Sequence, residues 1–328
     1  MTQTTGTGAP KSSGLAAIAG KAEQLRRLEL LVTRKLDGLL RGEFLGLQPG
    51  PGTEPYGTRD YEPGEDARRI DWNLSARSLQ PQLRTTEADR ELQTWVVVDR
   101  SASMNFGTAL AEKSEIAFAT VAAFGFLIAR YGNRFGIMVA GGDEPLRLGP
   151  ASTRPQLLAE LSRLYDLPRA ERQPGPDATL AGTLAALERA HPRRGQIVVV
   201  SDFLEDTDWP RVLTRLSFGH QTLCVQVVDP RELTLPPVGM LTVVDTETGK
   251  RMNVQSNSSA LRARYAAAAA QRDDTIQRLV RAARSEHLSL ATDRDWLLEI
   301  VKYVASRRAM QRGTTRSLAR VGTLRSVK

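Results

Sequence analysis

The sequence has few of the residues on which several common kinds of protein depend. It holds one cysteine, Cys224, which excludes an internal disulfide, and only three histidines in 328 residues. Cys224 lies in the apolar run TLCVQVV, so we expect a small buried side chain. The patterns HExxH, GxSxG and GxxxxGKS do not occur. Their absence argues against a zinc protease, a nucleophile-elbow hydrolase and a P-loop ATPase.

Long apolar runs are also missing. The longest, residues 116–129, is shorter than the roughly 18 residues that a membrane-spanning helix needs, and it predicts a buried helix instead. The opening segment MTQTTGTGAPKSSG lacks the basic stretch and apolar core of a secretory signal. We therefore expect a cytoplasmic protein without a transmembrane segment.

The net charge of +8 is concentrated at one end of the chain. Residues 307–328 hold seven basic residues and no acidic ones, with little hydrophobic periodicity. This composition predicts a flexible basic tail. A solvated tail without a specific ligand is the simplest interpretation, and nucleic acid, an anionic membrane surface and an acidic protein are the alternatives.

The chain is long enough for one large domain and a smaller attachment. We expect a disordered N-terminus over 1–13, then an N-terminal unit over 14–93 that opens with an amphipathic helix near 22–40. A large domain follows over 94–306, with a hairpin near 241–254, and the basic tail covers 307–328. In the large domain, short apolar runs such as TWVVVD and QIVVVSD alternate with helical segments. This alternation predicts a doubly wound, mostly parallel α/β sheet flanked by helices.

The strongest chemical signal is VVVDRSASM, where an apolar strand runs directly into Asp99, Ser101 and Ser103. A second strand, QIVVVSDF, ends on Asp202 in the same way. Since ligands of doubly wound sheets bind at the carboxyl ends of the strands, both acids are expected on one rim. A hard cation such as Mg²⁺ prefers oxygen ligands, so the pattern predicts a divalent metal site there. Thr179, which precedes a helix, is either a further ligand or a helix cap.

These residues resemble the metal ion-dependent adhesion site of von Willebrand A domains. That site uses Asp-x-Ser-x-Ser, a threonine from a second loop and an aspartate from a third. The resemblance implies Mg²⁺ or Mn²⁺ bound by Asp99, Ser101, Ser103, Thr179 and Asp202. The loop before Thr179 contains Pro and Asp where paired glycines are usual, which makes Thr179 the weakest match.

Further upstream, YGTRDYEPGEDARRIDWNLSAR resembles the signature of the bacterial DUF58 family. The typical form of that signature is Arg-x-Tyr-x-Pro-Gly-Asp-Asp followed by Arg-x-Ile-Asp-Trp and Ser-Ala-Arg. Glu65 replaces the first of the paired aspartates and keeps its charge. We expect an ion-pair network that fixes a loop, with Trp72 buried as an anchor and Arg59 or Arg77 paired with a carboxylate, in preference to a binding surface. The residues of this motif are Arg59, Tyr61, Asp66, Arg69, Asp71, Trp72 and Arg77.

The two resemblances together imply a binding protein, not an enzyme. None of the three histidines has a convincing catalytic partner in the sequence. In von Willebrand A domains the ion commonly completes its coordination with a carboxylate of a partner protein. In DUF58 proteins the resemblance implies a MoxR-type AAA+ ATPase as partner, acting with a client protein in a chaperone or assembly role. The alternatives are a metal-assisted hydrolase and a binder of nucleic acid or anionic surfaces through the basic tail.

Overall fold

Strands of the six-stranded sheet at the centre of the molecule lie in the order β10-β7-β6-β3-β4-β5. In chain order they are β3 (Gln93–Asp99), β4 (Arg134–Ala140), β5 (Leu146–Ala151), β6 (Gln196–Ser201), β7 (Gln221–Val228) and β10 (Glu286–Ala291). All neighbouring pairs are parallel except β4 and β5, which are antiparallel. The computed structural model describes residues 14–37, 58–60, 70, 72–78, 80–84, 93–130, 132–170, 174–192, 194–244 and 251–307.

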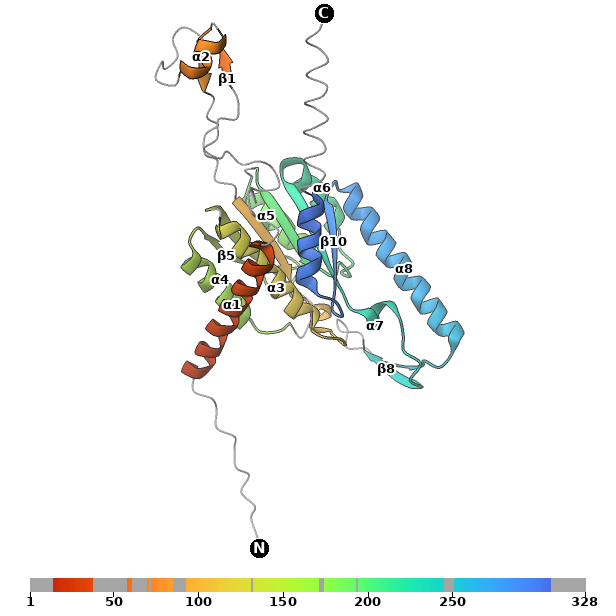
Figure 1. Cartoon of the computed structure of the whole chain (residues 1–328). Coiled ribbons are helices and arrows are strands. Elements are labelled where there is room, and N and C mark those ends of the chain that lie inside the picture. The colour runs from red at the N-terminus through yellow and green to blue at the C-terminus, as the bar shows by residue number, and fades with distance from the viewer. Residues whose placement is uncertain are drawn as a thin grey trace, which may run out of the picture.

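Both faces of this sheet are covered by helices (Figure 1). The covering helices are α1 (Gly14–Asp37), α3 (Lys113–Arg130), α4 (Arg154–Asp166), α5 (Leu180–Ala190), α6 (Trp209–Gly219), α8 (Ser259–Ala282) and a last helix over 296–307. The short helix α7 (Pro230–Leu233) follows the carboxyl end of β7. Alternate residues of β3 serve the two faces, because successive side chains of a strand point in opposite directions. Val96 and Val98 belong to one buried cluster, and Trp95 and Val97 belong to the other. The doubly wound α/β sheet predicted from the sequence is therefore confirmed.

The N-terminal helix α1 packs on this core. Leu25 and Val32, seven residues apart and hence on one helical face, are buried in the same cluster as α3. Two surface ion pairs add to the contact: Glu29 with Arg154 at 2.6 Å and Lys35 with Asp295 at 2.5 Å. The helix begins at Gly14 and not near residue 22, as the apolar spacing alone predicted.

The structure contains an edge strand, β5, that the sequence did not predict, and a hairpin near residues 240–255. Strand β5 reads LRLGPA, and its Gly-Pro step hid the strand pattern. The hairpin consists of β8 (Met240–Val244) and β9 (Arg251–Gln255), which pair antiparallel close to the predicted bounds. A second small pair joins β1 (Thr58–Asp60) to β2 (Gln82–Arg84), with α2 (Trp72–Ser78) between them in the chain. Within the described residues, none of the helices is long and apolar enough to cross a membrane. The predicted disordered N-terminus, 1–13, and the basic tail beyond Arg307 lie outside those residues.

Candidate metal centre

The carboxyl ends of β3 and β6 meet at one rim of the sheet. The two strands are neighbours and parallel, and they end at Asp99 and Ser201. Asp202 follows directly, so both acids that the sequence analysis singled out lie at this rim, and both are buried. The next strand, β4, ends there too, with Ala140 opposite Asp99.

Asp99 is held by hydrogen-bond donors alone. Its Oδ1 accepts a hydrogen bond from the Ser101 backbone N–H at 2.8 Å, and its Oδ2 accepts one from the Ser201 hydroxyl at 2.6 Å. Within the described chain no lysine, arginine or histidine forms an ion pair with Asp99. Burial, together with the nearby Asp202 carboxylate, raises the pKa of Asp99 above its usual range. Within the part of the chain that the structure describes, the site therefore holds a buried acid without a counter-cation.

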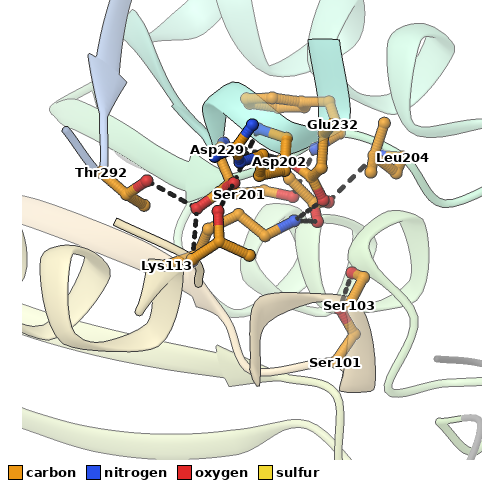
Figure 2. A network of polar contacts seen from close by, with 12 residues as sticks. Ser101, Ser103, Lys113, Ser201, Asp202, Leu204, Asp229, Glu232 and Thr292 are labelled. Carbon is orange, nitrogen blue, oxygen red and sulfur yellow. Dashed lines mark hydrogen bonds and ion pairs between the residues drawn. The ribbon is translucent and has the colours of Figure 1, made fainter. Parts of the chain in front are cut away.

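Ser101 and Ser103 present two hydroxyl oxygens beside this acid. They lie at the start of a short 3-10 helix, η2 (Ala102–Asn105), and both are buried. Their Oγ atoms are 3.1 Å apart, and the pair faces the space below Asp202 in Figure 2. Gly141, with a φ of +99°, lets the end of β4 approach the loop, since a Cβ there would come within 2.4 Å of the Ser101 nitrogen.

Thr179 is the N-cap of α5. Its Oγ1 accepts a hydrogen bond from the Gly182 N–H at 3.0 Å and donates one to the Pro176 carbonyl at 3.1 Å. The start of α5 is tied to the same rim by a hydrogen bond from the Gly141 N–H to the Ala178 carbonyl. Of the two roles considered for Thr179, the structure shows the cap, and its role as a metal ligand stays a prediction.

Asp202 has a partner that the sequence analysis did not identify. Lys113, the first residue of α3, is fully buried and lies between two carboxylates, with its Nζ 2.8 Å from Asp202 Oδ2 and 2.5 Å from Glu232 Oε1 (Figure 2). The other oxygen of Asp202, Oδ1, accepts a hydrogen bond from the Leu204 N–H at 3.1 Å. Burial alone would lower the pKa of Lys113, but the two carboxylates raise it above its ordinary value. The available signal was a lysine three residues before the apolar run of residues 116–129.

The charges at the rim do not cancel. Asp99, Asp202 and Glu232, taken with the one ammonium group of Lys113, leave a negative excess when ionised, and the Asp229 carboxylate after β7 adds to it. A divalent cation would reduce this excess. Asp99 with two buried serine hydroxyls offers the hard oxygen ligands that Mg²⁺ and Mn²⁺ prefer, so the residues present fit such an ion.

Comparison with known proteins identifies the family. The model of the family described as "Protein of unknown function DUF58" matches residues 57–275. This chain belongs to the DUF58 family. Uncharacterized proteins of Mycobacterium tuberculosis and Mycobacterium bovis are 44% identical to it over 287 residues, which cover 88% of this chain and 90% of theirs. An uncharacterized protein of Mycobacterium avium is 39% identical over 129 residues, 39% of this chain and 76% of its own.

Solved structures with lower similarity include von Willebrand A-type domains. An aerotolerance-related membrane protein of Bacteroides fragilis is 13% identical with a TM-score of 0.44, covering 66% of this chain and 98% of its own. The VWA domain of SpRpn10 is 15% identical with a TM-score of 0.36, covering 64% of this chain and 93% of its own. The arrangement of the sheet, five parallel strands with β5 antiparallel at one edge, is that of a von Willebrand A-like fold.

The signature segment of this DUF58 protein is only partly described. Tyr61, Asp66, Arg69 and Asp71 lie outside the described residues, and of Arg59 only its place in β1 is described. Trp72 is 69% exposed on α2, so the prediction that it anchors the segment by burial was wrong. The described part of this segment, a seven-residue helix of about two turns and two three-residue strands, offers too little surface to enclose an indole. Arg77 is exposed as well, and within the described residues no carboxylate pairs with it.

The histidines of the DUF58 protein lie away from the rim. His220 is the C-cap of α6, and its Nδ1 contacts the Leu216 carbonyl at 3.1 Å. His287 contacts Gln226 Oε1 at 2.8 Å, and His191 is the buried C-cap of α5. The described residues include no group of three or more His, Cys, Asp or Glu side chains arranged to hold a metal. The site at Asp99 is of another kind, because two of its candidate ligands are serine hydroxyls.

Proposed function

We propose that this DUF58 protein is a metal-dependent, non-enzymatic adaptor that binds a carboxylate of a partner protein at the Asp99 rim. The observation that carries the proposal is the buried, uncompensated Asp99 beside the hydroxyls of Ser101 and Ser103. A divalent ion held there would supply the missing positive charge and keep open positions for an anionic ligand from outside the chain.

The protein's own residues have distinct parts in this proposal. Asp99 supplies the charged ligand, and its orientation is fixed by the Ser101 N–H and the Ser201 hydroxyl. Ser101 and Ser103 supply neutral ligands, which do not neutralise the ion further. Asp202 takes part through its negative charge, because its carboxylate already forms an ion pair with the Lys113 ammonium, whereas that of Asp99 accepts only from an N–H and a hydroxyl. Thr179 lies at the neighbouring helix start as a further candidate ligand.

The partner follows from the family resemblance. DUF58 membership supports a MoxR-type AAA+ ATPase as the protein with which the adaptor works, in a chaperone or assembly role toward a client. The ATPase or its client would then present the carboxylate. A hydrolase has no such support, because the described carboxylates beside Asp99, those of Asp202 and Glu232, are both engaged by the Lys113 ammonium, and the three histidines lie away from the rim.

The first test measures binding of Mg²⁺ and Mn²⁺ by isothermal titration calorimetry with wild type and Asp99→Asn. The asparagine variant keeps the size of the side chain and removes its charge, so we expect metal binding to be lost while the fold, followed by circular dichroism, is kept. Asp206→Asn is the matched control, since Asp206 is an exposed acid four residues after Asp202. Equal metal affinity in wild type and Asp99→Asn would contradict the proposal.

The second test measures binding of the MoxR-type ATPase from the same genome by biolayer interferometry, in Mg²⁺ and in EDTA. We expect binding to wild type and to Asp206→Asn in Mg²⁺ only, and no binding to Asp99→Asn. Binding that persists in EDTA would show that the partner does not need the metal.

A further inference from the structure

Lys113 is an unusual residue for the interior of this protein. Lysines are almost never fully buried unless they are paired, and Lys113 is 0% exposed. Its position is fixed from the preceding loop, where the Lys113 N–H donates to the Phe106 carbonyl at 2.9 Å. In the same loop, Thr108 is tied to the buried Asp229 through both its N–H and its hydroxyl. The loop and the start of α3 thus hold the ammonium group at one place.

That place lies between two carboxylates from different elements. Asp202 follows β6, and Glu232 belongs to α7, which follows β7. Glu232 is itself held, because its second oxygen accepts a hydrogen bond from the Asp229 N–H at 3.2 Å in the capping box of α7. Oxygen atoms that lie 2.8 and 2.5 Å from one nitrogen are close enough for a single divalent ion to bridge, since Mg²⁺ and Ca²⁺ bind oxygen at about 2.0–2.6 Å.

A small cavity reaches these carboxylates. Its volume is about 30 Å³, and Asp202, Glu232, Gln226, Arg272 and Asp273 are among the residues that line it. A space of this size holds about one water molecule, so a small cation could reach the two acids without unfolding of the rim.

We propose that Lys113 is a built-in cation that fills a second cation position at Asp202 and Glu232, and thereby limits this rim to one divalent ion. The functional role of Lys113 rests on the proposed metal site at Asp99, but the effect of Lys113 on the number of bound ions can be tested without that site. By engaging Asp202 and Glu232, Lys113 withholds two carboxylates from an ion at Asp99. That ion then keeps more of its positive charge for the carboxylate of a partner.

The test counts Mn²⁺ ions bound by the full chain, using calorimetry and electron paramagnetic resonance of free Mn²⁺. Wild type is expected to bind one ion, and Lys113→Ala, which removes the ammonium and opens its space, is expected to bind two. Lys113→Ala/Glu232→Gln lacks one of the two carboxylates and should return to one ion. An unchanged count in a folded Lys113→Ala variant would overturn the inference.

A third variant separates this inference from the proposed function. Asp99→Asn/Lys113→Ala should bind one ion, at Asp202 and Glu232. If wild type binds none and Lys113→Ala binds one, the Asp99 site is refuted while the role of Lys113 is upheld.

Anomalous diffraction from wild-type crystals soaked in Mn²⁺ tests the same point without any substitution. No manganese peak should lie between Asp202 and Glu232, where Lys113 stays in place. A peak there, with Lys113 displaced, would refute the built-in cation even if the alanine variant fails to fold.

Discussion

Replacement of Asp229 by asparagine should destabilise the protein strongly, because every acceptor position of this buried carboxylate is used. Its Oδ1 accepts from the Thr108 hydroxyl at 2.6 Å and the Arg231 N–H at 2.9 Å. Its Oδ2 accepts from the Thr108 N–H at 2.8 Å and the Thr292 hydroxyl at 2.7 Å. These four bonds join the loop before α3, the start of α7 and the end of β10.

The magnitude follows from what an amide group does to these four bonds. Whichever oxygen becomes NH₂ then faces one hydroxyl, which can rotate and accept, and one backbone N–H, which cannot. One hydrogen bond is lost, and a buried backbone N–H is left unpaired. The remaining hydrogen bonds become weaker, because their acceptor is no longer charged. Since hydrogen bonds to charged groups contribute about 1.5–3 kcal/mol each, we expect a loss of about 3 kcal/mol in the free energy of unfolding.

Urea denaturation at pH 7 measures this loss, with Asp274→Asn on the exposed face of α8 as the control, expected within about 0.5 kcal/mol of wild type. The pH dependence adds a second check. Burial by itself raises the pKa of Asp229, but the hydrogen bonds from Thr108, Thr292 and Arg231 outweigh it and hold that pKa below its usual range. The stabilisation is therefore complete above the unfolded-state pKa of about 3.9 and is lost as the pH falls through the folded-state pKa. A loss below about 1 kcal/mol at pH 7, or a gap between the variants that stays constant below pH ~4, would refute the reasoning.

One substitution, at Gly136, and one labelling reaction, at Cys224, test the packing of the sheet. Gly136→Ala would place a Cβ 2.4 Å from the ring of Trp95, and such overpacking should cost about 1–3 kcal/mol in urea denaturation. In Gly142→Ala the nearest atom is 3.6 Å away, so this control should match wild type, and equal stabilities of the two variants would show that Trp95 moves freely. Burial raises the pKa of Cys224 to about 12, so the native thiol should not react with dithionitrobenzoate at pH 8 and should react fully in denaturant. Rapid labelling of the native protein would contradict the buried position.

Local sequence patterns were enough to predict most of the sheet. Strands β3, β6 and β7 are continuous apolar runs, and a strand buried on both faces requires such a run. Strand β5 escaped prediction because it lies at an edge, where a strand tolerates glycine, proline and half-exposed side chains. The exposure of Trp72 was not predicted, because an indole was taken to indicate burial. That rule holds only where the chain supplies enough surface to cover the ring.

Part of the candidate site could also be predicted from the sequence. Asp99, Ser101 and Ser103 lie within five residues of one another, so their proximity needs only one strand and one turn. The placement of Asp202 beside them needs the additional rule that parallel strands end at the same rim. These two steps use local pattern and general topology, and the structure places all four residues at that rim.

Lys113 and Glu232 needed contacts that no local pattern contains. They are separated by 119 positions, and Lys113 is 89 positions from Asp202, so their ion pairs depend on how α3 and α7 pack against the ends of β6 and β7. Once formed, these contacts and the four bonds of Asp229 fasten the loop before α3 and the start of α7 to the same rim. The proposed ion or partner carboxylate would meet side chains that are already in position, and little entropy of ordering would oppose its binding. The rigidity of the rim is therefore a consequence of buried charges that are individually costly, and it is the property that a metal-dependent binding surface requires.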